Sequence, residues 1–341
     1  MTDGLIDTTA IATWMQAHVQ GFNGQITAQK FTGGQSNPTY KLSSKSGEYV
    51  LRRKPPGQLL KSAHAVDREF HVQRALAGTD VPIAKMRAFC DDDSVIGSVF
   101  YIMDYVEGRT FVDPRLQILN FDERRLIFDD MNRVLAAIHS VDLSATGLTG
   151  FGPHGNYYQR QIDRWVKQYR ASETEVIPDM DALIDWLTQN VVKDDGRIAL
   201  VHGDYRIDNL LFALDAPKCV AVLDWELSTL GHPFADLASV IMQWSLPPGV
   251  TGRGLAGVDR AELGIPEDQA FIDAYCARMD LPGIDRFGFY LGFSFFRMAA
   301  ILQGVKRRAL DGNASNPERA LELGAYVPAF AAGGLRAIAS L

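Results

Sequence analysis

The pattern of apolar and polar positions predicts a short leading helix followed by a region of strands. Residues 8–20 place apolar side chains on one helical face, after a helix cap at Thr8 or Thr9. From residue 25 to about 105, the apolar residues come in strand-sized runs separated by Gly and Pro, notably 40–42, 49–52 and 99–103. One longer segment, 65–77, has helical spacing. This order of elements predicts a small α+β lobe.

After Gly108 the apolar spacing becomes mainly helical. Helical repeats cover 123–139, 157–169 and 180–191, and further helices are predicted to begin near residues 234, 266, 285 and 316. Short β-prone runs lie between them, at 198–201, 210–212 and 219–223. We therefore expect a second, mostly helical lobe, with residues 1–106 forming the first lobe and 107–341 the second.

Composition and charge exclude several classes of protein. The 341 residues are 47% hydrophobic, which is typical of a globular protein with a substantial core. The net charge is −7 and no run of Lys or Arg stands out, so we expect no nucleic-acid partner. Cys90, Cys219 and Cys276 are too widely spaced for a disulfide framework or a zinc site. With Asp3 and Asp7 near the start and no long apolar run, we expect a cytoplasmic protein without membrane contact.

The residues 202–209 carry the strongest chemical signal. They read His-Gly-Asp-Tyr-Arg-Ile-Asp-Asn and lie between two predicted strands, so that Asp204 and Asn209 share one loop. Asp224 ends the next predicted strand. Phosphoryl transfer needs a carboxylate that accepts the proton of the attacking hydroxyl, together with oxygen ligands for magnesium. The order of these residues favours Asp204 as the base and Asn209 and Asp224 as magnesium ligands, although any single Asp could simply cap a turn.

This loop, with the acid that ends the following strand, resembles the aminoglycoside phosphotransferase and choline kinase superfamily. Its catalytic loop reads H-G-D-x-x-x-x-N, and the similarity extends over about residues 25–310. The resemblance implies a protein-kinase-like fold of two lobes, in which 1–106 binds the nucleotide and 107–341 carries catalysis and binds the substrate. It also implies an enzyme that moves a phosphoryl group from ATP to an alcohol group, with Mg²⁺ as cofactor.

The loop of residues 31–40 lies between two strand-like runs, as does the phosphate-covering loop of this superfamily. The resemblance implies that it binds the nucleotide through Gly33, Gly34, Ser36 and Asn37. Small residues allow backbone N–H groups to approach phosphate oxygens. The same residues also describe an ordinary hairpin turn, which is the alternative.

The next strand should carry a cation for the α- and β-phosphates. Alternation places Val50, Arg52 and Lys54 on one face of this strand and Arg53 on the other. If Val50 packs on adenine, Arg52 is the phosphate-binding cation, where most members of the superfamily have lysine. Arg53 and Lys54 remain alternative candidates for this cation, and at least one of the three residues is expected to be an ordinary solvated charge on an edge strand.

The resemblance also implies an acidic partner for this cation and a hinge that binds adenine. Glu69, within the predicted helix 65–77, is the expected partner, and Asp67 competes with it. At the hinge, Met103 should line the adenine pocket, the carbonyl of Asp104 should accept from the adenine amine, and the N–H of Val106 should donate to the ring.

Three further residues are expected to be structural. His202 should support the backbone of the catalytic loop rather than transfer a proton, and His139 should lie in the core at the end of a helix. Asp236 matches a further motif of the superfamily, which implies that it anchors the catalytic loop through backbone N–H groups.

The acceptor is the least constrained part of this interpretation. Residues 49–57 and 64–69 are most similar to the branch associated with acyl-CoA dehydrogenases, which implies a hydroxyacyl-CoA or hydroxy acid as acceptor and a functional link to such a dehydrogenase. An aminoglycoside is the alternative. Asp208 and Glu226 are the acids near the base, whereas the same lobe carries positive charges that disfavour a polycation, at Arg206, Arg297 and 306–308. A catalytically silent nucleotide-binding module is a third hypothesis, supported only by the substituted cation.

Overall fold

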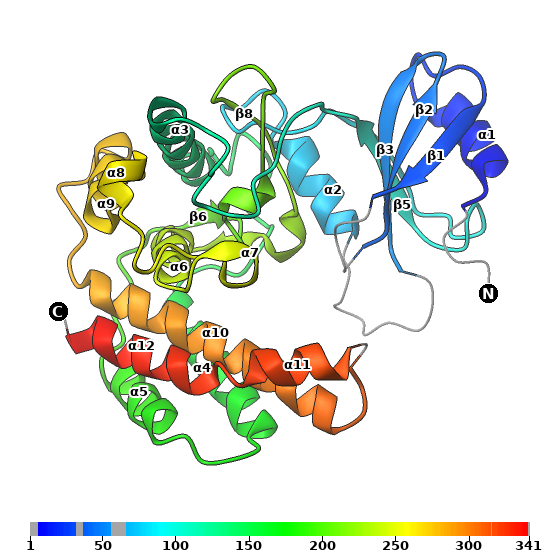
Figure 1. The fold of residues 1–341 in the computed structure, drawn as a ribbon. Helices are drawn as coiled ribbons and strands as arrows, with labels where there is room; N and C mark the ends of the chain where they lie inside the picture. The colour runs from blue at the N-terminus through cyan, green and yellow to red at the C-terminus, as the bar shows by residue number, and fades with distance from the viewer. Residues whose placement is uncertain (1–5, 32–36, 56–65, 315, 340–341) are drawn as a thin grey trace. The chain divides into compact units, whose positions relative to one another are not determined.

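The computed structural model describes residues 6–31, 37–55, 66–314 and 316–339, and the ribbon in Figure 1 shows its elements in order. The chain forms two compact units. The first unit comprises residues 1–111, 141–149 and 207–228, and the second unit comprises the remainder. Residues 107–111, 141–149 and 207–228 of the predicted C-terminal lobe therefore belong to the first unit. The division into lobes at residues 106 and 107 stays a prediction.

The first unit is built on a five-stranded antiparallel sheet. Its strands follow the spatial order β1-β2-β3-β5-β4. Their bounds are Ile26–Lys30 (β1), Thr39–Ser44 (β2), Gly47–Arg53 (β3), Met86–Cys90 (β4) and Phe100–Asp104 (β5). In the pairing of β3 with β5, Leu51 lies opposite Ile102 and Arg52 lies opposite Tyr101. Because side chains alternate along a strand, these two neighbouring pairs point to opposite faces of the sheet.

Helices α1 (Thr8–His18) and α2 (Val66–Ala75) lie on opposite sides of this sheet (Figure 1). Helix α1 packs in one apolar cluster with Leu51 and Ile102. On the other face, Phe70 of α2 clusters with Tyr101. The predicted alternation along β3 is therefore confirmed. It places the side chain of Arg52 on the face of the sheet that α2 covers.

The cap of α1 differs from the predicted one. The carboxylate of Asp7 accepts hydrogen bonds from the N–H groups of Thr9 and Ala10, at 3.0 and 2.9 Å. The predicted caps, Thr8 and Thr9, lie inside the first turn. Prediction of a threonine cap was wrong because an aspartate one residue earlier supplies the acceptor that the free N–H groups need.

A hairpin of β7 (Leu210–Phe212) and β8 (Cys219–Val222) completes the described strands of the first unit. A short 3-10 turn, η1 (Ile207–Asn209), precedes it, and another, η2 (Trp225–Leu227), follows it. Arg109 and Phe212 exchange backbone hydrogen bonds of 2.8 and 2.9 Å. A Cβ atom at position 108 would lie 2.6 Å from the carbonyl oxygen of Phe212, so this close approach of the two backbones requires glycine. The hairpin is thereby fixed to the segment that follows β5.

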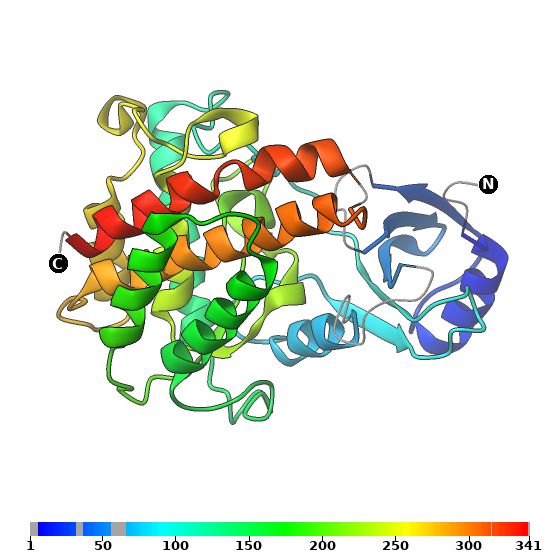
Figure 2. The same cartoon turned by 90° about the horizontal axis from the view of Figure 1, so that it is seen from below.

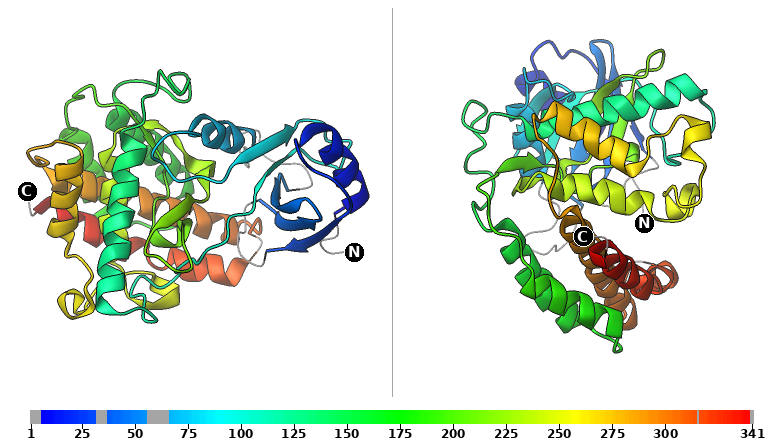
Figure 3. Two further views of the ribbon diagram at one scale, coloured as in Figure 1. Left: turned by 90° about the horizontal axis from the view of Figure 1, so that it is seen from above. Right: turned by 90° about the vertical axis from the view of Figure 1, so that its left-hand side faces the viewer.

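The second unit is mostly helical. Its longer helices are α3 (Phe121–His139), α4 (Tyr157–Ser172), α5 (Pro178–Gln189), α6 (Phe234–Trp244), α9 (Asp268–Arg278), α10 (Phe287–Leu310), α11 (Pro317–Gly324) and α12 (Val327–Ala339). Two single turns, α7 (Gly249–Gly252) and α8 (Arg260–Leu263), and the strand pair β6 (Ala199–Val201) and β9 (Thr229–Gly231) complete it. Helix α10 packs against α4, α6, α11 and α12. Figure 2 shows α10 in orange beside the orange-red and red helices α11 and α12. Helix α3 lies beside α9 (Figure 3).

Helix α10 is the core helix of the second unit. By length and composition alone it could cross a membrane, with a mean hydropathy of 1.2 over 18 residues. However, 61% of that window is buried among neighbouring helices, which is typical of the core helix of a globular unit. Cys90, Cys219 and Cys276 are buried free thiols.

Candidate active site

Three carboxylates surround the guanidinium of Arg52 in the first unit. Its Nε lies 2.9 Å from Oε2 of Glu69, which comes from α2. Its Nη2 lies 2.7 Å from Oδ1 of Asp224, directly after β8, and 3.8 Å from Oε2 of Glu226. The Arg52 side chain is only 14% exposed and that of Glu69 is 2% exposed. The structure therefore brings together the predicted phosphate cation, its predicted acidic partner and a predicted magnesium ligand.

Burial and charge act against each other in this cluster. Burial alone lowers the pKa of Arg52, but the nearby carboxylates, Glu69 foremost, raise that pKa above its ordinary value. Burial raises the pKa of Glu69 to about 7, although the positive charge of Arg52 lowers it. The 2.9 Å between Nε and Oε2 is an ion-pair distance, yet among the described residues neither atom completes an aligned hydrogen bond. Arg52 is held by charge at Glu69 and by a hydrogen bond at Asp224.

Tyr101 is a buried neighbour of this cluster that the sequence analysis did not identify. It lies directly opposite Arg52 in the pairing of β3 with β5. Its hydroxyl forms hydrogen bonds with the side chains of Glu69 and Gln73. Burial raises the pKa of Tyr101, so the hydroxyl stays protonated and donates to Glu69. The strand register places it there, and a single sequence does not reveal that register.

The alternative residues for the cation and its partner lie elsewhere. Asp67 lies on α2 two residues before Glu69. It is exposed, whereas Glu69 is buried. Arg53 points to the other face of the sheet, where its Nε donates to Oγ of Ser98 at 2.8 Å. Lys54 follows the end of β3 and is half-buried. Of these candidates, only Arg52 and Glu69 form a described ion pair with each other.

Most of the predicted glycine-rich loop lies outside the described residues. This applies to Gly33, Gly34 and Ser36. Asn37, at the end of the loop, is described and buried, and its Nδ2 donates to Oε2 of Glu226 at 3.4 Å. Glu226 thus approaches both Asn37 and Arg52, a link between the loop and the cation that the sequence analysis missed.

The predicted hinge residues follow one another at the end of β5. Met103 lies opposite Val50 in the sheet. The carboxylate of Asp104 binds Arg87 through two hydrogen bonds of 2.5 and 2.8 Å. The N–H of Val106 makes no hydrogen bond with the part of the chain that the structure describes. A backbone donor is therefore left available where the prediction places the adenine ring.

The two predicted magnesium ligands are brought close by their backbones. The N–H of Leu223 donates to the carbonyl oxygen of Asn209 at 2.8 Å, and Asp224 follows directly. Asp224 has a left-handed backbone conformation, with φ of 62°. One amide and one carboxylate oxygen fit a magnesium ion whose other ligands are phosphate oxygens and water. Among the described residues, no group of three His, Cys, Asp or Glu side chains is placed to hold a metal by itself.

The predicted base, Asp204, lies in the second unit, in the loop that follows β6. Asp236 of α6 anchors this loop, because its carboxylate accepts from the N–H groups of His202 and Gly203, at 2.6 and 2.9 Å. The predicted role of Asp236 is confirmed. His139 is buried and lies 3.4 Å from Oδ2 of Asp236 through its Nε2. These hydrogen bonds hold the start of the loop to α6.

Asp204 itself is partly exposed, with 31% of its side chain accessible. Its N–H donates to Nδ1 of His202 at 3.3 Å, which is the supporting contact expected of that histidine. Nε of Arg206 lies 3.4 Å from Oδ2 of Asp204. The chain passes from the second unit to the first between Arg206 and Ile207. Asp204 and Asn209 thus belong to consecutive parts of one loop but to different units, whereas Asp224 follows β8 in the first unit.

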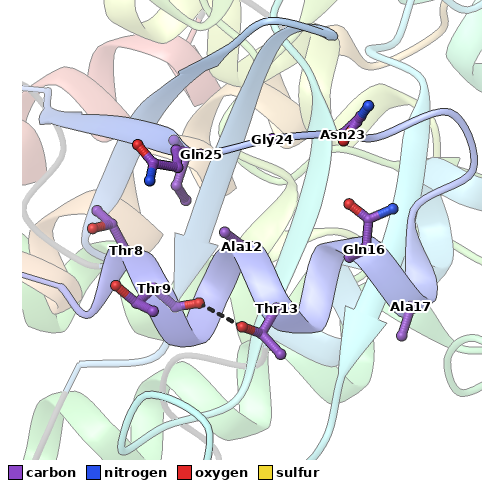
Figure 4. A pocket seen from close by; sticks show the side chains of 10 residues that line it. Thr8, Thr9, Ala12, Thr13, Gln16, Ala17, Asn23, Gly24 and Gln25 are labelled. Atoms are coloured by element: carbon purple, nitrogen blue, oxygen red, sulfur yellow. Dashed lines mark hydrogen bonds between the residues drawn. The ribbon is translucent and has the colours of Figure 1, made fainter.

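A separate surface pocket of about 730 Å³ lies between α1 and the segment that leads into β1 (Figure 4). Small and uncharged side chains line it, including Thr9, Thr13 and Gln16. The hydroxyl of Thr13 is already bonded to the carbonyl oxygen of Thr9 at 3.0 Å. No predicted site residue lies in this pocket, and it supplies neither a charge nor a nucleophile for phosphoryl transfer.

Comparison with known proteins supports the interpretation of the sequence. The family model of the phosphotransferase enzyme family matches residues 27–290. Acyl-CoA dehydrogenase family member 10 of Mus musculus is 48% identical over 294 residues, which cover 86% of this chain and 27% of that protein. Across the acyl-CoA dehydrogenase relatives from mouse, this chain spans 27% to 42% of their length.

Solved structures give the same result for the fold. A candidate aminoglycoside phosphotransferase from Ralstonia eutropha is 48% identical, with a TM-score of 0.91, covering 98% of this chain and 99% of that one. A mutant of aminoglycoside phosphotransferase APH(4)-Ia, in complex with AMP-PNP and hygromycin B, gives a TM-score of 0.62 at 17% identity, covering 98% and 100%. The predicted kinase-like fold, with a small antiparallel sheet and a helical majority, is confirmed. By the family match and the likeness to the Ralstonia protein, this chain belongs to the phosphotransferase enzyme family.

Proposed function

We propose that this protein transfers the γ-phosphoryl group of ATP to a hydroxyl of a small molecule, with magnesium as cofactor. The observation that carries the proposal is the position of Arg52 between Glu69 and Asp224, at 2.9 and 2.7 Å. A cation fixed beside a metal-binding carboxylate supplies the positive charge that phosphoryl transfer requires at the phosphates. Membership of the phosphotransferase family supports this assignment.

Each residue of the first unit would have a defined task with the nucleotide. Arg52 would bind the α- and β-phosphates, and Asn209 and Asp224 would hold the magnesium ion. Bound magnesium would neutralise charge on the phosphate oxygens. The other expected contacts come from the glycine-rich loop and the hinge, namely Gly33, Gly34, Ser36, Asn37, Met103, Asp104 and Val106. Glu69 would orient Arg52 rather than touch the nucleotide, because it lies buried behind the guanidinium.

Asp204 would accept the proton of the acceptor hydroxyl as that oxygen attacks the γ-phosphorus. Its partial exposure leaves it accessible to a small molecule. Asp236 would keep it in place, since it holds the two preceding N–H groups of the loop. A base of this kind typically contributes about 10²- to 10⁴-fold to the rate.

For the acceptor, we propose a hydroxyacyl-CoA or a related hydroxy acid. The 48% identity to a protein named as an acyl-CoA dehydrogenase family member supports this choice, together with a functional link to such a dehydrogenase. An aminoglycoside is the second candidate, favoured by the name of the Ralstonia relative. Among the described residues, cationic side chains near Asp204, such as Arg206, disfavour a polycationic acceptor because like charges repel.

The decisive experiment incubates the protein with Mg·ATP and a panel of hydroxyacyl-CoAs, hydroxy acids, aminoglycosides, choline and amino alcohols. Mass spectrometry then detects the gain of one phosphoryl group. We expect phosphorylated hydroxyacyl-CoA or hydroxy acid with the wild type. The Asp204→Asn variant should turn over about 10²- to 10⁴-fold more slowly and still bind ATP. Tight ATP binding without transfer to any acceptor would instead favour the silent module.

A further inference from the structure

Two helices of the second unit place a cation and an aromatic ring next to the predicted base. Arg297, in the middle of α10, donates from Nη2 to the carbonyl oxygen of Gly203 at 3.3 Å. Gly203 directly precedes Asp204 in the chain. The guanidinium carbon of Arg297 lies 5.9 Å from the ring centroid of Trp165 on α4. A flat ring on one side and the catalytic loop on the other thus position this guanidinium.

Arg297 differs in its partners from other arginines of this unit, such as Arg260 and Arg278. Arg260 binds Asp268, and Arg278 binds Asp129 at 2.7 Å. Arg297 has no carboxylate partner among the residues that the structure describes. A guanidinium carries five N–H donors, and only one of those of Arg297 is used in a described hydrogen bond. A half-buried cation of this kind still has donors in a fork that matches a carboxylate or phosphate.

Other positive charges act on the same region of α4. Burial raises the pKa of Tyr157, and the cations Arg297, Arg160 and Arg164 each offset part of that rise. Arg160 donates to the carbonyl oxygen of His154, whereas Arg164 packs against the ring of Trp165. The surface formed by α4 and the middle of α10 therefore carries excess positive charge, although the whole chain has a net charge of −7.

Support of the loop alone does not account for Arg297. The loop is already anchored by Asp236, through two backbone hydrogen bonds of 2.6 and 2.9 Å. One carbonyl oxygen needs one donor, which a neutral side chain can provide. A charged fork in contact with the residue before the base is suited to an anionic ligand.

We propose that Arg297, backed by Trp165, binds an anionic group of the acceptor beside Asp204, either a carboxylate or a phosphate. This inference rests on the proposed function, because it takes Asp204 as the base. Arg297 would be a specificity-determining residue that selects acidic acceptors over neutral alcohols and polycations.

The test compares three acceptors of equal chain length: a hydroxy acid, its CoA thioester and the corresponding neutral diol. In Arg297→Met we expect kcat/KM for at least one anionic acceptor to fall by about 10- to 100-fold, mainly through KM. The value for the diol should change by less than about threefold. Loss with the free acid alone identifies a carboxylate as the bound group, and loss with the thioester identifies a phosphate. Arg308→Met, which removes an exposed charge from the same helix, is the matched control.

Equal losses for the acid, the thioester and the diol would overturn the inference, because they would show a role in loop support only. Arg297→Lys keeps the charge and should retain part of the preference for anionic acceptors over the diol. This variant keeps the inference testable if Arg297→Met fails to fold. Calorimetric binding of the same three compounds gives a reading that is independent of turnover. If the wild type transfers no phosphoryl group, the proposed function fails. Even then, unchanged affinity of Arg297→Met for both anionic compounds would overturn this inference, and reduced affinity would support it.

Discussion

At the scale of single residues, the central feature is Arg52, whose guanidinium lies between two carboxylates. Its planar fork lets separate nitrogens face Glu69 and Asp224. A lysine would present one ammonium group to both. Glu69 and Asp224 are therefore coupled through Arg52, and substitutions at these three positions should not be additive in their effects.

Substitutions along β3 test which cation acts on the phosphates. Arg52→Ala should lower kcat by roughly 10²-fold and lower it at least as much as it raises KM, because alignment of the phosphates is lost. Arg52→Lys should keep substantial activity, since the charge remains. Arg53→Ala is the matched control and should have little effect, because Arg53 binds Ser98 on the other face. Steady-state kinetics with varied ATP would contradict this assignment if Arg53→Ala were the damaging change.

The raised pKa of Glu69 predicts a pH dependence of stability. Its pKa is about 7 in the folded protein, against an ordinary value of 4.5, so the folded state binds the proton more tightly. The resulting stabilisation is complete below pH 4.5 and is lost as the pH rises through 7. Urea unfolding from pH 5 to 8 should therefore show a larger loss of stability for the wild type than for Glu69→Gln. Asp67→Asn, an exposed control on α2, should follow the wild type. Parallel curves for the wild type and Glu69→Gln would contradict the prediction.

At the scale of elements, the contact between α6 and the catalytic loop should depend on the carboxylate of Asp236. Although burial alone raises the pKa of Asp236, hydrogen bonds from His139 and from the loop hold it below the ordinary value, so Asp236 is charged at neutral pH. In Asp236→Asn, an amide cannot accept all of these bonds. We expect a loss of about 2–4 kcal/mol in the free energy of unfolding, together with reduced kcat.

The control for this variant is Ser239→Ala on the same helix, since the described side-chain hydrogen bond of Ser239 is with Gln243 and not with the loop. It removes one buried polar group without touching the loop. Urea unfolding of the two variants measures the difference. If both lost the same free energy of unfolding, Asp236 would have no special role in holding the loop.

The sequence predicted long periodic elements well and edge strands poorly. Helices begin at Tyr157 and Phe234, as expected, because α4 buries apolar residues at helical spacing and α6 is apolar and buried along almost its whole length. Strands β1 and β4 were not identified individually. They form the two edges of the sheet, and each has only one fully buried residue, so no apolar alternation marks them. Strand β9 was not predicted either, because its three residues are too few to show a periodic pattern.

The candidate site was predictable where it follows from local order in the chain. The loop of residues 202–209 and the acid after β8 are such signals, and the anchoring role of Asp236 followed from a short motif. The positions of Tyr101 and Glu226 beside Arg52 were missed because they depend on strand pairing and on contacts between distant segments. Asn37 and Glu226, for example, are 189 residues apart in sequence. No local pattern encodes such a contact.

At the scale of the whole molecule, nucleotide binding should be visible as thermal stabilisation. A ligand at 100 times its dissociation constant stabilises the folded state by about 2.7 kcal/mol, which raises Tm by several degrees for a chain of this size. We expect Mg·ATP to raise Tm of the wild type and ATP with EDTA to raise it less. In Asp224→Ala the difference between the two should disappear. Equal shifts for the wild type and the variant, measured by differential scanning fluorimetry, would rule out Asp224 as the main metal ligand.

The left-handed backbone of Asp224, with φ of 62°, has a consequence for how this protein could evolve. Asparagine and glycine adopt that conformation as readily as aspartate, whereas most other residues are strained there. A single-nucleotide change in an aspartate codon gives either of the two. If Asp224 holds the metal as proposed, one such mutation would remove its carboxylate while the backbone conformation stays allowed. An inactive paralogue could differ from an active one only here, so this codon is the first to inspect when descendants of this chain are sorted into enzymes and pseudoenzymes.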